Sequence, residues 1–342
     1  MWRPSDIRRD GARGPLFPAA AAGLVMLVLL LFPGVCAAAS PPSTGFWAGV
    51  SVPTALYEAP DTDSRALGVI PARDQEGLPV SFRVQQLVDR NGVQWFRTRV
   101  GSVHGWGSAP GLVAAAPLPL SPTLRRALSA SMARAGAGAS AVFADSSGQT
   151  LFASQGFRIR ILASNVKIFV TAAALDRIGA VVGPLLGRIL RRSDNWLAQR
   201  LLERLARSRL ERIRIAEGYA SILGSEVQLV DGSGLGRANR AAPSSVVAFL
   251  VGMRLTPSFA LWRDAFPVAG RTGTLADRMR GTPADGACQA KTGTLRDVST
   301  LSGYCTTSSG RRIVFSILLN DIAPRKGRWL QDQMVASLVR LG

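Results

Sequence analysis

The chain has 342 residues with an apolar content of 47%, which is long enough for two globular domains and excludes a disordered chain. The excess of 41 Lys and Arg over 22 Asp and Glu gives a net charge of +19. Such a polycation is expected to associate peripherally with anionic membranes or wall polymers. No RNA- or DNA-binding motif is present and the arginines are scattered, so nucleic acid is not expected as a partner.

Residues 1–39 have the order of an export signal. Four arginines precede a charge-free apolar stretch at 16–35, and an A-x-A cleavage site follows at 37–39. The alternative is a retained membrane anchor, because about 20 apolar residues can span a bilayer. Either interpretation predicts an exported protein of the periplasm or cell envelope. Loss of 1–39 leaves two cysteines, an even number that suits an oxidising compartment.

Residues 46–113 are predicted to form a small all-β domain. Short apolar runs alternate with turn residues, and an Asn-Gly pair at 91–92 signals a hairpin. The spacing of Tyr57, Trp95 and Gly105-Trp106-Gly107 resembles that of a bacterial SH3-like barrel. The resemblance implies a module that binds cell-wall peptides, and a spacer is the alternative. The Pro-rich stretch 114–123 is expected to be a linker.

Residues 124–342 are predicted to form an α+β domain. Two short strands about a Ser-Ser-Gly turn lie in 140–155, and three alternating runs and an amphipathic helix follow residue 286. Helical patterns cover 123–136, 164–179 and 183–207. A strand hairpin before the helices, three strands after them and a closing helix predict an antiparallel sheet flanked by helices.

Lysine is rare in this chain: Lys167, Lys291 and Lys326 are the only three among 41 basic residues. Lys167 lies three residues after Ser164 at the start of a predicted helix, which puts both side chains on one face about 5–6 Å apart at Cβ. A serine becomes a good nucleophile when a neighbour takes its proton. Lysine can do so if burial lowers its pKa, whereas arginine cannot be deprotonated. The alternative is a helix cap with a surface lysine.

Two further motifs follow in order. Ser193-Asp194-Asn195 begins a second predicted helix, where its alternative role is an N-cap, and Lys291-Thr292-Gly293 lies on a predicted strand. S-x-x-K, S-D-N and K-T-G form the signature set of penicillin-recognising serine enzymes. The single histidine, His104, lies in the SH3-like segment, which argues against a Ser-His-Asp triad and a zinc site. No metal or other cofactor is therefore expected.

The pentapeptide at 291–295, KTGTL, is nearly repeated at 271–275 as RTGTL. The later copy is followed by two more predicted strands, so it can line the edge of a cleft. The earlier copy precedes a polar helical or turn pattern with no partner strand. We therefore expect it to take no part in the site.

With these motifs, residues 124–342 resemble the class C low-molecular-mass penicillin-binding proteins, the D-alanyl-D-alanine carboxypeptidase/endopeptidase family. The stretches 229–240 and 273–295 are also similar to ones typical of that family. The resemblance implies acyl transfer on peptidoglycan stem peptides, with β-lactams as covalent inhibitors. Ser164 would attack the D-Ala-D-Ala carbonyl, and Lys167 would take its proton.

The same resemblance implies substrate-binding roles for the other motif residues. Ser193 would relay a proton and Asn195 would hold the substrate amide. Lys291 and Thr292 would bind the terminal carboxylate. The backbone N–H groups of Ser164 and of Thr294, which follows Gly293, would form the oxyanion hole.

The chain departs from the family in one respect: family members carry long inserted domains between S-x-x-K and S-D-N, whereas 25 residues separate Lys167 from Ser193 here. A tight helical hairpin at 179–183 would return the chain to the cleft. Two alternatives to a carboxypeptidase or endopeptidase stay open. One is a β-lactamase, although no E-x-x-L-N segment is found, and the other is a weakly active wall-binding protein.

The two remaining cysteines are predicted to form a disulfide. A hairpin centred between Arg296 and Asp297 would place Cys288 directly opposite Cys305. Opposite residues have Cβ atoms close enough for a bond between their sulfurs. The bond would fix the register that aims Lys291 and Thr292 into the cleft. The alternative is two small buried thiols.

Overall fold

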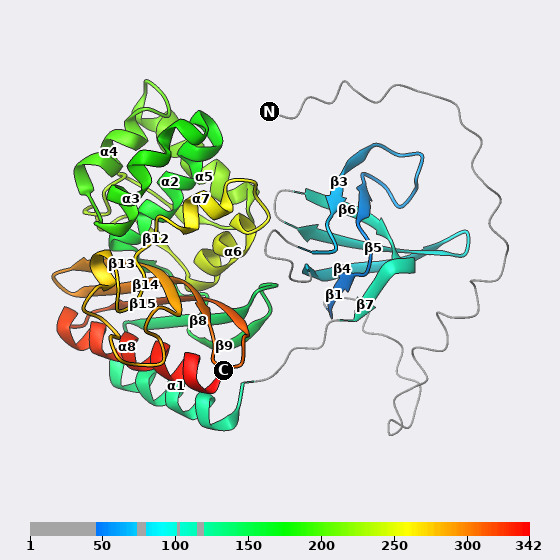
Figure 1. Cartoon of the computed structure of the whole chain (residues 1–342). Coiled ribbons are helices and arrows are strands. Elements are labelled where there is room, and N and C mark those ends of the chain that lie inside the picture. Colours follow the sequence, from blue (N-terminus) through cyan, green and yellow to red (C-terminus); the bar gives the residue numbers. More distant parts are fainter. Residues whose placement is uncertain (1–45, 74–79, 101–102, 115–119) are drawn as a thin grey trace. The chain divides into compact units, whose positions relative to one another are not determined.

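The computed structural model describes residues 46–73, 80–100, 103–114 and 120–342 (Figure 1). The predicted export signal or anchor at 1–39 and residues 115–119 of the predicted linker lie outside these ranges. Within them, none of the helices combines the length and the apolar character that crossing a membrane requires.

The first part is a seven-stranded sheet with the strand order β3-β2-β6-β5-β4-β1-β7. Asn91 and Gly92 have positive φ angles of 53° and 76°, and they connect β4 to β5 as the hairpin signal predicts. Phe82 and Phe96 stack in its core with ring centroids 5.2 Å apart. The strands are Phe46–Val50 (β1), Thr54–Tyr57 (β2), Ala66–Ile70 (β3), Ser81–Arg90 (β4), Val93–Val100 (β5), Val103–Ser108 (β6) and Leu112–Ala114 (β7). The strands are as predicted, and the SH3-like assignment stays an interpretation.

The second part is built on a five-stranded antiparallel sheet with the order β13-β14-β15-β8-β9. Helices α1 (Pro122–Ala135) and α8 (Pro324–Leu341) pack on one face of it, and the other helices lie on the opposite face (Figure 1). The strands are Ala139–Asp145 (β8), Thr150–Ser154 (β9), Cys288–Leu295 (β13), Val298–Thr306 (β14) and Arg312–Asn320 (β15). The predicted α+β fold with an antiparallel sheet between helices is confirmed.

The two faces of this sheet are separated by strict alternation of side chains. Phe143 and Phe315 join the core under α1 and α8, whereas Val142 and Val314 join the core of the helical layer. Successive residues of a strand point to opposite faces, so one strand supplies both cores. The helical layer contains Val166–Ile178 (α2), Gly183–Arg191 (α3), Asn195–Glu203 (α4), Arg209–Ile222 (α5), Pro243–Met253 (α6) and Phe259–Arg263 (α7).

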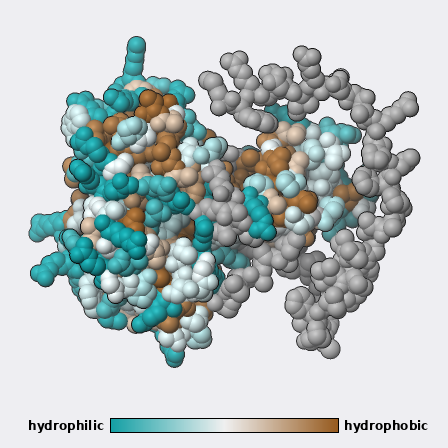
Figure 2. Space-filling view, viewed as in Figure 1, coloured by the Kyte–Doolittle hydropathy of each residue, from teal (hydrophilic) through white to brown (hydrophobic). Residues whose placement is uncertain are grey.

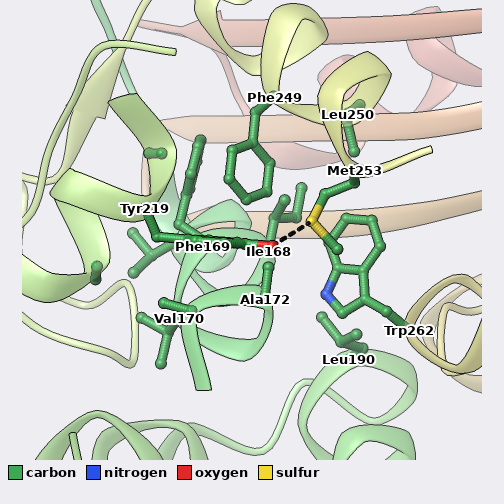
Figure 3. Packing of buried hydrophobic residues seen from close by; sticks show 14 of the residues in the cluster. Ile168, Phe169, Val170, Ala172, Leu190, Tyr219, Phe249, Leu250, Met253 and Trp262 are labelled. Atoms are coloured by element: carbon green, nitrogen blue, oxygen red, sulfur yellow. Dashed lines mark hydrogen bonds between the residues drawn. The ribbon is translucent and has the colours of Figure 1, made fainter. Parts of the chain in front are cut away.

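Helix α2 is the buried centre of the helical layer. Figure 3 shows Phe169 of α2 against Phe249 of α6, with ring centroids 4.6 Å apart, and Trp262 of α7 beside them. The indole nitrogen of Trp262 donates to the hydroxyl of Thr171 at 2.9 Å, and that hydroxyl donates to the carbonyl of Lys167 at 2.6 Å. A helix surrounded in this way gives the residues at its N-terminal end a fixed position.

The connection from α2 to α4 is a compact helical hairpin, as expected. Gly179 ends α2 with a φ of 89°, and α3 then runs back toward the sheet. The helical pattern predicted over 183–207 is interrupted, because Ser193 has a φ of 61° and Asp194 caps α4 by accepting from Leu197 N at 2.9 Å. Figure 2 shows apolar patches over the helical layer. Exposed apolar side chains of this layer include Val181, Trp196, Leu210, Ile222 and Leu261.

The β13–β14 hairpin has the predicted register. Cys288 lies directly opposite Cys305, with Cα atoms 4.1 Å apart, and their sulfurs are bonded in the structure. In the same register Lys291 faces Ser302 and Thr292 faces Leu301. The hairpin therefore carries the K-T-G strand at one edge of the sheet.

Candidate active site

The three motifs meet in one cleft with a volume of about 560 Å³. Ser164 enters it from the short helical turn Ala163–Asn165 just before α2, and Ser193 and Asn195 enter from the α3–α4 turn. Strand β13 supplies Thr292, Gly293 and Thr294, and the remaining lining residues are Gly273, Thr274, Asp277, Arg278 and Arg328. In the part of the chain that the structure describes, no three His, Cys, Asp or Glu side chains gather as a metal site requires.

Lys167 is fully buried behind Ser164. Its amine lies 2.9 Å from the Ser164 hydroxyl oxygen and 2.8 Å from Oδ1 of Asn195, and it donates a further short hydrogen bond to the carbonyl of Ser233. Two of these partners, the amide oxygen and the carbonyl, can only accept. A neutral amine that donates to both keeps its lone pair for the third partner, the hydroxyl of Ser164.

The surroundings of Lys167 make that neutral form more accessible. Burial lowers the pKa of its amine to about 8, and the charges of Asp231 and Asp194 offset part of this effect. An ordinary lysine has a pKa of about 10.4 and is almost wholly charged at neutral pH. Burial thus brings the amine within reach of a proton-accepting role.

Lys291 is also fully buried, and it links the K-T-G strand to the S-D-N turn. Its amine donates to the Ser193 hydroxyl at 2.9 Å and to the carbonyl of Thr292 at 2.7 Å. Burial holds the pKa of Lys291 well below its ordinary value, and the charge of Lys167 lowers it further. Burial therefore disfavours the charged form of this amine, the form that a carboxylate-binding role suggests.

The glycine of K-T-G allows β13 to pass close to the nucleophile. A Cβ at Gly293 would overlap the hydroxyl of Thr300 and lie 3.0 Å from the backbone nitrogen of Ser164. Asn165 ties the two segments together by donating to the Lys291 carbonyl at 3.1 Å and to the Thr300 hydroxyl at 2.8 Å. The backbone around Ser164 and that of Gly293 and Thr294 thus border one space.

The expectation that the earlier pentapeptide copy takes no part in the site is wrong. It forms no strand, as predicted, but a short helical turn at Gly273–Leu275. The hydroxyl of Thr292 donates to that of Thr274 at 2.7 Å, and Gly273 and Thr274 both line the cleft. Strand pattern was the wrong criterion, because an isolated turn can reach the cleft through tertiary packing alone.

The loop at 231–236 is a second feature that the motifs did not assign to the site. The Asp231 carboxylate accepts from the Ser233 hydroxyl at 2.9 Å, from Gly234 N at 2.6 Å and from Gly236 N at 2.7 Å. These hydrogen bonds keep the pKa of Asp231 below its ordinary value although burial raises it. The loop presents the Ser233 carbonyl to Lys167. An Asp among glycines is typical of a turn in which the carboxylate accepts from nearby backbone N–H groups. This pattern is the feature of the sequence that could have indicated the loop.

Comparison with known proteins agrees with this geometry. Residues 182–341, a little under half of the chain, match the sequence profile of the D-Ala-D-Ala carboxypeptidase 3 (S13) family. The matched range starts after Ser164 and Lys167, and it includes Ser193, Asn195 and residues 291–294.

Part of the chain is similar to curated carboxypeptidases. It is 45% identical over 115 residues to D-alanyl-D-alanine carboxypeptidase of Actinomadura sp. (strain R39), a match that covers 32% of this chain and 21% of that protein. It is 30% identical over 178 residues to Carboxypeptidase DacB of Mycolicibacterium smegmatis, a match that covers 46% of this chain and 38% of that protein. It is 30% identical over 149 residues to D-alanyl-D-alanine carboxypeptidase DacB of Haemophilus influenzae, a match that covers 40% of this chain and 31% of that protein. The chain therefore spans less than two fifths of the length of each relative.

Solved β-lactamases share the fold. A class A β-lactamase from Mycobacterium abscessus matches with a TM-score of 0.53 and 19% identity, covering 64% of this chain and 98% of that one. A β-lactamase from Chitinophaga pinensis matches with a TM-score of 0.53 and 15% identity over 64% and 97%. At this level of identity the likeness establishes the fold alone.

Proposed function

We propose that the chain is a serine-type D-alanyl-D-alanine carboxypeptidase that acts on peptidoglycan stem peptides through an acyl-enzyme on Ser164. The observation that carries the proposal is the contact between Lys167 and Ser164. Of the three partners of the buried amine, only the Ser164 hydroxyl has a proton to give. A serine beside a base of lowered pKa is the arrangement that nucleophilic catalysis requires.

In the proposed reaction, neutral Lys167 takes the hydroxyl proton while the Ser164 oxygen attacks the carbonyl of the penultimate D-Ala. The backbone N–H groups of Ser164 and Thr294 stabilise the oxyanion. Ser193 gives its hydroxyl proton to the leaving nitrogen and regains one from Lys291, which lies 2.9 Å away. The peptide bond breaks and D-Ala leaves. Water then attacks the ester, its proton replaces through Ser193 the one that Lys291 gave, and the Ser164 oxygen leaves with the proton that Lys167 took. Asn195 holds the substrate amide.

Lys291 and Thr292 are proposed to bind the terminal carboxylate, with Gly293 and Thr294 shaping the same edge of the cleft. The lowered pKa of Lys291 fits this role, because a buried amine gains a proton when an anion binds beside it. Substrate binding would then charge Lys291 only when its counter-ion is present. Lys291 can serve both the carboxylate and Ser193 in this way.

The comparisons support the proposal. Two of the three relatives are described as D-alanyl-D-alanine carboxypeptidases, and the matched family is described as D-Ala-D-Ala carboxypeptidase 3. The short helical hairpin between Lys167 and Ser193 leaves the cleft with fewer walls than inserted domains would provide. We therefore include endopeptidase activity on larger, cross-linked peptides in the proposal.

The location of the protein and its accessory partners are proposed from features of the sequence. The export signal or anchor at 1–39 puts the chain in the cell envelope, where peptidoglycan is found. The SH3-like segment 46–113 is proposed to bind wall peptides, and the basic surface to associate with anionic polymers. β-Lactams are proposed as covalent inhibitors because they acylate serines in sites of this type.

A β-lactamase is the second candidate, favoured by the fold likeness. Against it, the class A enzymes use a Glu in an E-x-x-L-N segment for deacylation. Glu226 is the only glutamate followed by a leucine at the third position, and the next residue is Val230. Its side chain is exposed on the loop before β11 (Val227–Gln228) and does not line the cleft.

Fluorescent penicillin and purified muropeptides test the proposal. The full chain should label with the penicillin, and mass spectrometry should detect loss of the terminal D-Ala from pentapeptide muropeptides. Ser164→Ala should abolish both while thermal unfolding stays unchanged. Rapid hydrolysis of a chromogenic cephalosporin would favour the β-lactamase. Binding to peptidoglycan without labelling would favour a wall-binding protein, and full labelling of Ser164→Ala would refute the assigned nucleophile.

A further inference from the structure

Thr274 contributes a hydroxyl to the cleft from outside the three motifs. Its oxygen lies 2.7 Å from the hydroxyl oxygen of Thr292, although the two residues are 18 positions apart in the chain. Both hydroxyls belong to the lining of the cleft that also contains Ser164. The contact therefore joins a second segment to the proposed carboxylate-binding edge of β13.

The segment that carries Thr274 is held in place by its neighbours. Gly273 has a φ of 59°, and a Cβ there would lie 2.6 Å from Cγ of Arg191, which leads into the S-D-N turn. Further along, Arg278 donates to the Asp332 carboxylate at 2.7 Å, which fixes the segment to α8. A hydroxyl mounted between two such anchors has little freedom to move away from Thr292.

A threonine hydroxyl has one proton and can donate it to only one acceptor at a time. If Thr292 donates to Thr274, its lone pairs are left to face the cleft and repel a carboxylate. If Thr274 donates instead, the proton of Thr292 is free to point at the carboxylate. An incoming anion favours the second orientation, and each hydrogen bond then polarises the next.

We propose that Thr274 is a positioning residue for substrates with a free C-terminal carboxylate, acting through the hydroxyl of Thr292. The inference rests on the proposed function for its choice of ligand. It gives the pentapeptide at 271–275 a role in selecting peptides that end in a free carboxylate. Arg328, whose exposed guanidinium side chain lines the same cleft, adds positive charge on the approach, and Asp277 opposes it.

The test uses binding without chemistry. In the Ser164→Ala background, calorimetry compares an N-acetylated peptide ending in D-Ala-D-Ala with the same peptide as its C-terminal amide. Three proteins are compared: the one with Thr274 unchanged, Thr274→Val, which keeps the shape and removes the hydroxyl, and Thr274→Ser, which keeps the hydroxyl. We expect the preference for the carboxylate to fall about tenfold in Thr274→Val and to persist in Thr274→Ser, since valine cannot donate the hydrogen bond that orients and polarises the Thr292 hydroxyl.

Three outcomes would overturn the inference: no preference for the carboxylate in the Thr274 protein, an unchanged preference in Thr274→Val, or equal weakening of both peptides. Thr274→Ala provides the same comparison if the valine variant does not fold. The labelling of Ser164 is measured separately. A preference that depends on Thr274 without labelling would leave the inference standing and refute the proposed chemistry, and labelling without such a preference would do the reverse.

Discussion

The amine of Lys291 lies 2.9 Å from the hydroxyl of Ser193, although 98 positions separate them in the chain. The contact places the S-D-N turn against the K-T-G strand, and Asn195 at the head of α4 then reaches Lys167 at 2.8 Å. Two buried lysines thus share one site but differ in their partners. This difference gives the first prediction.

Arginine should be far more damaging at 167 than at 291. Lys167→Arg should lower the rate of penicillin acylation by at least about a thousandfold, because a guanidinium cannot accept a proton. Lys291→Arg should lower it by about tenfold to a hundredfold, because Arg still donates to Ser193 and to a carboxylate but is larger than the buried lysine. Stopped-flow measurement of acylation compares the two. Equal losses would show that the lysines do not have separate tasks.

Acylation should depend on pH through Lys167. Its amine accepts a proton only when neutral, and its pKa is lowered to about 8. The acylation rate should therefore rise with pH, reach half its maximum near pH 8 and level off above that. Measured rates from pH 6 to 10 at constant ionic strength check this. A flat profile, or a midpoint near the ordinary lysine value, would contradict the proposed base.

The closeness of the 231–236 loop to the nucleophile can be tested at one glycine. A Cβ at Gly234 would lie 2.5 Å from the carbonyl carbon of Ala163 and 2.8 Å from Cα of Ser164. Gly234→Ala should lower the free energy of unfolding by at least about 3 kcal/mol, or displace Ser164 and remove most acylation.

Gly224 is the matched control, since its φ of 81° resembles that of Gly234 at 86° but nothing lies within 4 Å of its Cβ position. Gly224→Ala should cost only the backbone strain of about 1 kcal/mol and keep acylation. Thermal unfolding and penicillin labelling of both variants decide. If Gly234→Ala changes stability and labelling as little as Gly224→Ala does, the loop does not lie as close to Ser164 as the structure shows.

The disulfide should stabilise the K-T-G hairpin. In the chain-entropy account, a bond that closes a loop of this length contributes roughly 3 kcal/mol. Replacing Cys288 and Cys305 together by serine should therefore lower the free energy of unfolding by about that amount, as should reduction of the natural chain. Mass spectrometry of a non-reduced digest of periplasmically expressed protein should give the two cysteines in one linked peptide pair, and two free thiols would contradict the bond.

The sequence was most informative where a local pattern determines the structure. Strand alternation predicted β13 to β15, and the symmetric spacing about 296–297 predicted the register that pairs Cys288 with Cys305. The helical pattern over 183–207 was less reliable, because Ser193 adopts a positive φ that apolar periodicity does not encode.

The missed parts of the site depend on tertiary contacts. Thr274 has no strand or helix pattern that would assign it a role, and it reaches Thr292 because Gly273 lets the turn approach Arg191. The Ser233 carbonyl is a backbone group, so no residue type marks it as a partner of Lys167. Motifs identify side chains that do chemistry, but they do not identify the backbone that aims them.

Strand β13 is the last strand on its side of the five-stranded sheet, and it borders the cleft. One ladder of its backbone donors and acceptors, beside residues 291–294, is therefore not taken up by a partner within that sheet. An extended peptide can add to such an edge as a further strand, with affinity from main-chain pairing and selectivity from alternate side chains. Recognition of this kind would tolerate variation in every second side chain of a bound peptide. In a panel of stem peptides varied one position at a time, affinity would then change strongly and weakly at alternate positions.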